Sequence, residues 1–121
     1  MMKMPEIRKR VVLISFSTKG KKFHTPTERN QFFRELYGFK QVVVKGGKRY
    51  NYDREGLLGS MPHIRVEDSV FMVPEDNERE VEEYFDKWKQ MVDFHMTRMM
   101  LLEKKMLEEM KRQMESFEND E

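Results

Sequence analysis

After Pro74 the chain contains neither glycine nor proline, the two residues that most readily end a helix. Apolar residues recur through this stretch with a mean spacing of about 3.6 residues, the period of an α-helix. Acidic residues crowd its beginning, where they complement the positive end of a helix dipole. The pattern predicts one long amphipathic helix over residues 75–121. Its apolar stripe comprises Val81, Phe85, Trp88, Val92, Met96, Met99, Leu102, Met106, Met110, Met114 and Phe117.

About 42 helical residues in this stretch, at 1.5 Å each, would extend roughly 60 Å, about twice the width of a domain built from the preceding residues. Leaving its distal apolar side chains in water would forfeit free energy comparable to the stability of a small domain. We therefore expect a second copy of the chain to cover the stripe, giving a homodimer. The expected interface comprises Val92, Met96, Met99, Leu102, Met106, Met110, Met114 and Phe117. Two alternatives remain: the helix docks on its own sheet, or its methionines form an adaptable groove for a different protein.

Residues 1–74 carry the signs of a small sheet. Val11–Ser17 is a nearly continuous apolar, β-branched run, which is typical of a strand covered on both faces. Gln41–Lys45 and Lys48–Tyr52 flank Gly46-Gly47, and two glycines supply the positive φ angles of a tight hairpin turn. Ser69–Val73 is a further apolar run that predicts a strand.

One short helix is expected between the first strand and the hairpin. Thr25 has the position of an N-cap, Pro26 that of the first helical residue, and Glu28 that of the acid closing a capping box. Gly38 follows the last apolar residue of the helix, where a residue with positive φ is favoured.

Together these segments predict an α+β fold with two parts. Residues 1–74 would form a basic α+β domain whose small sheet combines the leading strand, a central hairpin and the further strand. Residues 75–121 would form the long Met-rich helix that makes a dimeric helical seam.

The charges are segregated between the two halves of the sequence. Residues 1–60 contain 14 Lys and Arg and 5 Asp and Glu, a net charge of +9. Residues 61–121 contain 9 and 17, a net charge of −8, which gives the overall +1. A basic segment of this kind favours a polyanionic partner, although it would also be explained if the basic half paired with the acidic helix.

The basic residues gather at two places suited to nucleic acid. Lys19, Lys21 and Lys22 precede the helix start at Thr25, where free amide groups and the dipole favour a phosphate. The predicted hairpin tip carries a second group beside an aromatic residue, as a ribbon that enters a groove or stacks on bases would. This group comprises Lys45, Lys48, Arg49 and Tyr50. The other interpretations are a solvated loop, and a hairpin whose tyrosines pack on the helix while its lysines prevent edge aggregation.

Several kinds of chemistry are not expected. The chain has no cysteine, and His24, His63 and His95 are scattered, so neither a disulfide nor a metal site is predicted. No nucleophile motif or cofactor loop is present, so we expect no enzyme activity, no cofactor and no small-molecule substrate. No apolar stretch approaches the roughly 20 residues of a membrane span, and we expect a cytoplasmic protein that does not contact membranes.

The sequence thus predicts a homodimeric nucleic-acid-binding protein, with DNA favoured over RNA, that acts as a transcriptional or chromatin-associated regulator. The alternative is a non-enzymatic interaction or scaffold protein that uses the Met-rich C-terminal helix.

Overall fold

The structure, a computed structural model, describes residues 9–18 and 23–119. The chain divides into two compact units, each described by itself below. Unit 1 comprises Met1–Lys22 and Met61–Glu121, and unit 2 comprises Phe23–Ser60. This division differs from the predicted boundary at residue 74, because the strands on both sides of that position share one sheet.

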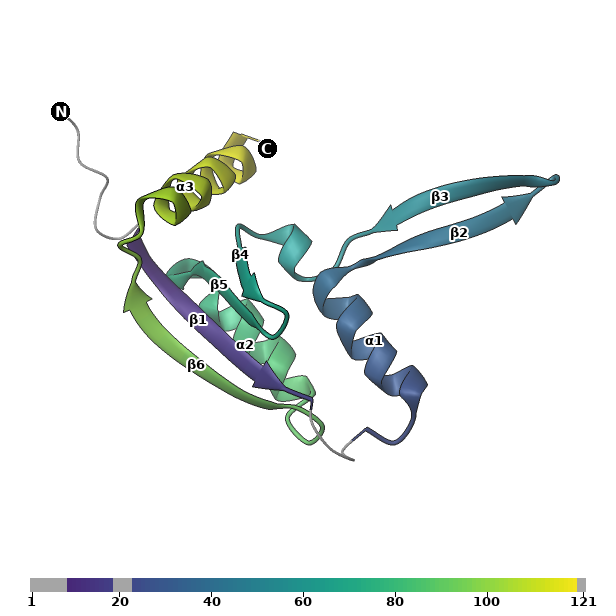
Figure 1. Cartoon of the computed structure of the whole chain (residues 1–121), viewed down its shortest axis with the longest axis horizontal. Coiled ribbons are helices and arrows are strands. Elements are labelled where there is room, and N and C mark those ends of the chain that lie inside the picture. Colours follow the sequence, from purple (N-terminus) through teal and green to yellow (C-terminus); the bar gives the residue numbers. More distant parts are fainter. Residues whose placement is uncertain (1–8, 19–22, 120–121) are drawn as a thin grey trace. The chain divides into compact units, whose positions relative to one another are not determined.

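Unit 1 is built on a four-stranded antiparallel sheet (Figure 1). The strands are ordered β4-β5-β1-β6, so β1 is central, as its apolar run predicts. Two helices, α2 before β6 and α3 after it, complete the unit together with the short helical turn η3. The bounds are β1 Arg10–Ser17, β4 Ile64–Glu67, β5 Val70–Pro74, η3 Glu75–Asn77, α2 Glu78–Lys87, β6 Asp93–Met100 and α3 Lys104–Asn119.

The two faces of this sheet are covered by different helices. On one face the ring of Phe85 in α2 lies 5.5 Å from that of Phe16 and 5.1 Å from that of Phe94, measured between centroids. On the other face Met110 of α3 is buried with Val11 and with two further core residues, Met72 and Leu101. Neighbouring residues of β1 point to opposite faces, so its continuous apolar run serves both layers.

The predicted continuous helix over residues 75–121 is wrong. Helix α2 ends at Lys87, a turn follows, and Asp93–Met100 forms β6. This segment pairs with β1 along its whole length, which places Phe94 opposite Phe16 and Met96 opposite Ile14. The sequence from Val92 to Thr97 also alternates apolar and polar residues, and a central β1 requires a strand on each side. The predicted helix is therefore helical only in two separate parts, α2 and α3.

Unit 2 consists of one helix and one hairpin. Helix α1 (Pro26–Tyr37) begins as predicted: the Thr25 hydroxyl accepts a hydrogen bond from the Glu28 amide at 3.1 Å. The Glu28 carboxylate accepts one from the His24 amide at 3.0 Å. The hairpin strands are β2 (Phe39–Lys45) and β3 (Lys48–Arg54), and the short helix η2 (Leu58–Ser60) follows. The hairpin forms its own two-stranded sheet, so the prediction that it shares one sheet with the other strands is wrong.

If the hairpin is set aside, the strands and first two helices follow the order β-α-β-β-α-β, a recurrent α+β motif. Such a motif supports many functions, so the connectivity does not assign one. No helix among the described residues is long and apolar enough to cross a membrane.

Candidate nucleic-acid interface

The β2–β3 hairpin has the register that its turn predicts. Val43 lies opposite Tyr50, and Lys45 lies opposite Lys48. Gly46 and Gly47 have φ angles of 59° and 78°, the positive values that a type I′ turn needs at both central positions. The turn therefore fixes which side chains share a face.

The two faces of the hairpin have different chemistry. Residues that are paired across an antiparallel ladder point to the same side, and the side alternates along each strand. We call one side the aromatic face; it comprises Phe39, Gln41, Val43, Lys45, Lys48, Tyr50, Tyr52 and Arg54. The other side, the opposite face, comprises Lys40, Val42, Val44, Arg49, Asn51 and Asp53. The predicted group of Lys45, Lys48, Arg49 and Tyr50 is therefore divided, because Arg49 alone lies on the opposite face.

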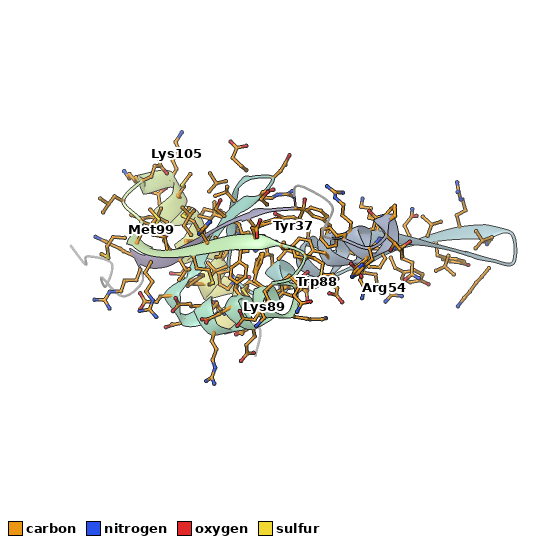
Figure 2. All side chains as sticks on the ribbon, turned by 90° about the horizontal axis from the view of Figure 1, so that it is seen from below. Tyr37, Arg54, Trp88, Lys89, Met99 and Lys105 are labelled. Atoms are coloured by element: carbon orange, nitrogen blue, oxygen red, sulfur yellow. The ribbon has the colours of Figure 1, made fainter. Side chains whose placement is uncertain are left out.

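Both faces of the hairpin are largely open to solvent. Tyr50 and Tyr52 are 42% and 41% exposed, and Val44 is 63% exposed. Side chains project from both sides of the ribbon beyond Arg54 (Figure 2). Lys45, Lys48 and Arg49 are exposed and have no carboxylate partner among the residues that the structure describes. A two-stranded hairpin that buries so little is a projecting arm rather than part of a core.

Backbone contacts attach the base of this arm to α1. The Leu57 amide donates a hydrogen bond to the Glu35 carbonyl at 2.7 Å. A Cβ on Gly38 would lie 2.5 Å from the Arg54 carbonyl oxygen, so the chain passes there only because Gly38 has no side chain. These contacts hold the hairpin at a fixed position relative to the helix.

Two arginines of unit 2 lie over aromatic rings of the hairpin. The Arg34 guanidinium carbon is 4.8 Å from the ring centroid of Phe39, and that of Arg54 is 5.5 Å from Tyr52. Arg54 Nε also donates a hydrogen bond to Gln41 Oε1 at 2.6 Å. These contacts orient two cations along the aromatic face.

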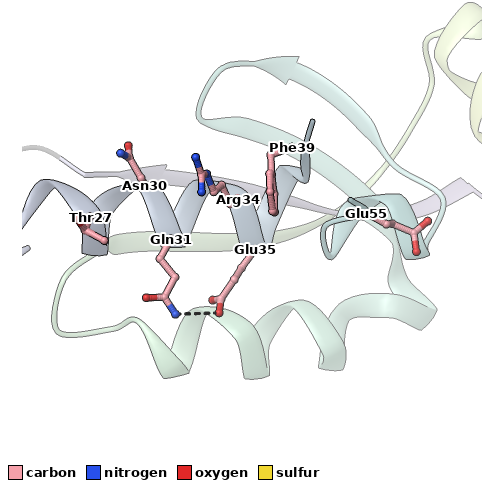
Figure 3. Close-up of a pocket in the computed structure, with 7 residues that line it drawn as sticks. All are labelled: Thr27, Asn30, Gln31, Arg34, Glu35, Phe39 and Glu55. Atoms are coloured by element: carbon pink, nitrogen blue, oxygen red, sulfur yellow. Dashed lines mark hydrogen bonds between the residues drawn. The ribbon is translucent and has the colours of Figure 1, made fainter. Parts of the chain in front are cut away.

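An open pocket of about 610 Å³ lies between α1 and the hairpin base (Figure 3). Six of its seven lining residues are polar or charged, and Gln31 Nε2 donates a hydrogen bond to Glu35 Oε1 at 3.4 Å. The lining residues are Thr27, Asn30, Gln31, Arg34, Glu35, Phe39 and Glu55. Sequence reasoning missed this site. The sequence features that point to it are polar residues that recur at helical spacing along α1 and an aromatic residue, Phe39, directly after Gly38.

The predicted phosphate site before α1 is only partly described. Thr25 is the N-cap, and the Glu28 carboxylate lies at the same helix end, where it accepts the His24 amide. Lys19, Lys21 and Lys22 lie outside the described residues. The loop therefore stays a prediction, and of the two predicted basic groups only the hairpin lies wholly within the described residues.

The eight residues expected at a dimer interface have different environments. Val92 and Met110 are buried within unit 1, and Met106 and Met114 are partly buried against the core around Met110. Met96 is partly buried in β6. Met99, Leu102 and Phe117 are exposed, and Leu102 is the most exposed of them at 76%.

The acidic start of α2 has a partner within unit 1. Arg98 of β6 donates two hydrogen bonds to Glu78 Oε2, at 2.8 and 3.1 Å. The hydrogen bond with Glu78 and its negative charge raise the pKa of Arg98. Glu78 is therefore paired with an arginine from residues 61–121, the acidic half of the sequence, and not with one from residues 1–60.

Within residues 9–18 and 23–119, no cluster of three or more His, Asp or Glu side chains could hold a metal ion. No family model, curated protein or solved structure matches the chain.

Proposed function

We propose that this protein binds nucleic acid, with DNA favoured over RNA, through the β2–β3 hairpin. The observation that carries the proposal is the exposure of this arm together with its charge. Residues 39–54 contain five basic side chains and one acidic one, Asp53, for a net charge of +4. A solvent-exposed ribbon of this charge is suited to contact phosphates, and a two-stranded ribbon fits the major groove of DNA.

The proposal includes a homodimer, so that two hairpins act on one nucleic acid as a transcriptional or chromatin-associated regulator would require. The sequence predicts the homodimer from a continuous helix of about 60 Å, and this helix is interrupted by β6. The exposed residues Met99 and Leu102, at and just after the end of β6, now support it instead, together with Phe117 of α3. The same exposed residues favour the second candidate, a protein-interaction role of the C-terminal region without nucleic-acid binding.

Titration of labelled duplex DNA and of RNA across a salt series tests the proposal. Phosphate contacts release counterions, so log affinity for duplex DNA should fall linearly with log salt, with a slope near −0.9 per contact. Binding that is absent even at low salt would refute the proposal and leave the protein-interaction role.

A triple variant locates the binding surface. We expect Lys45→Ala, Lys48→Ala and Arg49→Ala together to weaken duplex binding and to make the salt slope less steep by about one unit for each phosphate no longer neutralised. The matched control removes three exposed lysines of α3, Lys104, Lys105 and Lys111, which lowers the net charge equally. If both triple variants weaken binding to the same extent, then overall charge and not the hairpin determines affinity.

A further inference from the structure

The aromatic face concentrates the charge of the hairpin. It carries Lys45, Lys48 and Arg54 and no acidic residue, whereas the opposite face carries Lys40, Arg49 and Asp53. The net charges are therefore +3 and +1. Anionic phosphates are attracted to the aromatic face more strongly than to the other side of the same ribbon.

Three aromatic rings occupy this same face. From base to tip the ladder pairs Phe39 with Arg54, Gln41 with Tyr52, and Val43 with Tyr50, before the lysine pair at the turn. From Phe39 to Lys45 the strand spans about 20 Å, at about 3.4 Å per residue. Rings and cations therefore share a path long enough for a few extended nucleotides.

The pocket continues this path at the hairpin base, because Phe39 belongs to both. Its lining contains one guanidinium, Arg34, and two carboxylates, Glu35 and Glu55. The net negative charge disfavours a phosphate there. The amides of Asn30 and Gln31 can both donate and accept hydrogen bonds, as the edge of an uncharged base requires.

We infer that the aromatic face and this pocket bind an unpaired nucleic-acid strand. Bases stack on Tyr50 and Tyr52, phosphates lie against Lys45 and Lys48, and one base enters the pocket beside Phe39. The inference rests on the proposed function and specifies its substrate. In a duplex the faces of the bases are already stacked on one another. Only the bases of a single strand therefore have faces available to stack on exposed tyrosine rings.

The first experiment compares a labelled oligothymidine of about 12 nucleotides with a duplex of equal length at matched salt. We expect the single strand to bind at least about tenfold more tightly, because stacking on aromatic rings adds to phosphate attraction. Duplex binding that is equal or tighter would refute the inference, and the proposed function would stand. Loss of binding to both probes would remove the proposed function itself.

Ring variants then separate stacking from charge. Tyr50→Thr and Tyr52→Thr keep β-propensity and remove the rings, so each should weaken oligothymidine binding about tenfold. The salt slope should be unchanged, whereas Lys48→Ala should make it less steep by about 0.7, the value for one phosphate of a single strand. Tyr50→Phe and Tyr52→Phe retain the ring and should restore most of the affinity.

Asn51 provides the matched control, since it lies between the two tyrosines on β3 but belongs to the opposite face. Asn51→Thr should leave oligothymidine binding within about twofold. A decrease as large as that of the tyrosine variants would contradict the face assignment. Tyrosine variants that weaken duplex and single-strand binding equally would also count against stacking, because such a decrease reports on the hairpin fold.

Discussion

Gly56 makes the closest backbone approach in unit 2. A Cβ at this position would lie 2.3 Å from the Gly38 nitrogen and 2.7 Å from the Leu36 carbonyl, and both neighbours are backbone atoms that cannot rotate away. We expect Gly56→Ala to destabilise unit 2 by about 1–3 kcal/mol, as overpacking does elsewhere. Denaturation followed through amide signals of α1 and the hairpin measures this.

Gly59→Ala is the control for that experiment. Its Cβ would meet the Glu55 side chain, with Cγ at 2.6 Å, and this flexible chain can move aside. We expect it to destabilise unit 2 less than Gly56→Ala does. Equal decreases of stability in the two variants would show that the helix and the hairpin base do not touch at Gly56.

Glu109 forms a pH-dependent interaction on α3. Hydrogen bonds from Arg112, and next from Gln113, lower the pKa of Glu109 from 4.5 to about 2. Because the folded pKa lies below the unfolded value, the stabilisation is fully present above about pH 4.5 and disappears as pH falls through about 2. The carboxylate is exposed, so solvent and salt screen its effect on stability.

NMR titration of the Glu109 carboxyl carbon tests this interaction. We expect a midpoint near 2, and in Arg112→Ala a midpoint moved toward 4.5, since the hydrogen bond with the largest effect is removed. A wild-type midpoint already at the ordinary value would mean that the hydrogen bond from Arg112 is not maintained in solution.

At the level of the element, α3 packs on its own sheet. Met110 is fully buried with Val11 and Met72, whereas Phe117 near the end of the same helix is 39% exposed. We expect Met110→Ala to lower the free energy of unfolding by about 2–5 kcal/mol, as truncations of buried Leu, Ile and Met do. Phe117→Ala should lower the free energy of unfolding by a smaller amount, because this side chain is only partly buried.

Protein concentration distinguishes this packing from the expected dimeric seam. If Met110 is buried within the chain, the destabilisation in Met110→Ala should be the same at every protein concentration in urea or thermal denaturation. A destabilisation that grows with concentration would place Met110 between two copies, since the stability of an obligate dimer depends on protomer concentration.

The elements that the sequence predicts correctly are those fixed by neighbouring residues. The α1 start depends on Thr25 and Glu28, and the hairpin register depends on Gly46-Gly47, so each is readable from a few adjacent positions. Strand β6 depends instead on its pairing with β1, which is distant in sequence. Its apolar residues fit periods of both 3.6 and 2 over a short stretch, and the tertiary partner decides between them.

The candidate site follows the same physical rule. The basic hairpin can be predicted from sequence, because its strands and turn are contiguous. The complete pocket cannot, because it also depends on the close approach of Gly38 to Gly56, which brings Glu55 beside the end of α1. Neither glycine reveals its contact partner in the sequence alone.

At the scale of the whole molecule, the distribution of apolar surface bears on the proposed dimer. Burial of Val92 and Met110 within unit 1 removes them from a free surface, while Leu102 and Met99 remain exposed. A dimer that covers the exposed end of β6 would bury apolar side chains that otherwise stay in water. The relevant segment is therefore Met99–Leu102 rather than a long helical stripe.

Light scattering across a concentration series tests this directly. We expect a molar mass approaching twice the chain mass of 14.8 kDa, and a shift toward the monomer in Leu102→Gln. Val66→Gln changes another exposed apolar residue of unit 1, on β4, and should leave the mass unchanged. A wild-type monomer throughout the series would eliminate the dimer, and hairpin binding would then have to act from a single copy. An equal decrease of molar mass in both variants would mean that association depends on exposed apolar surface in general. Only a specific interface would respond to Leu102→Gln and not to Val66→Gln.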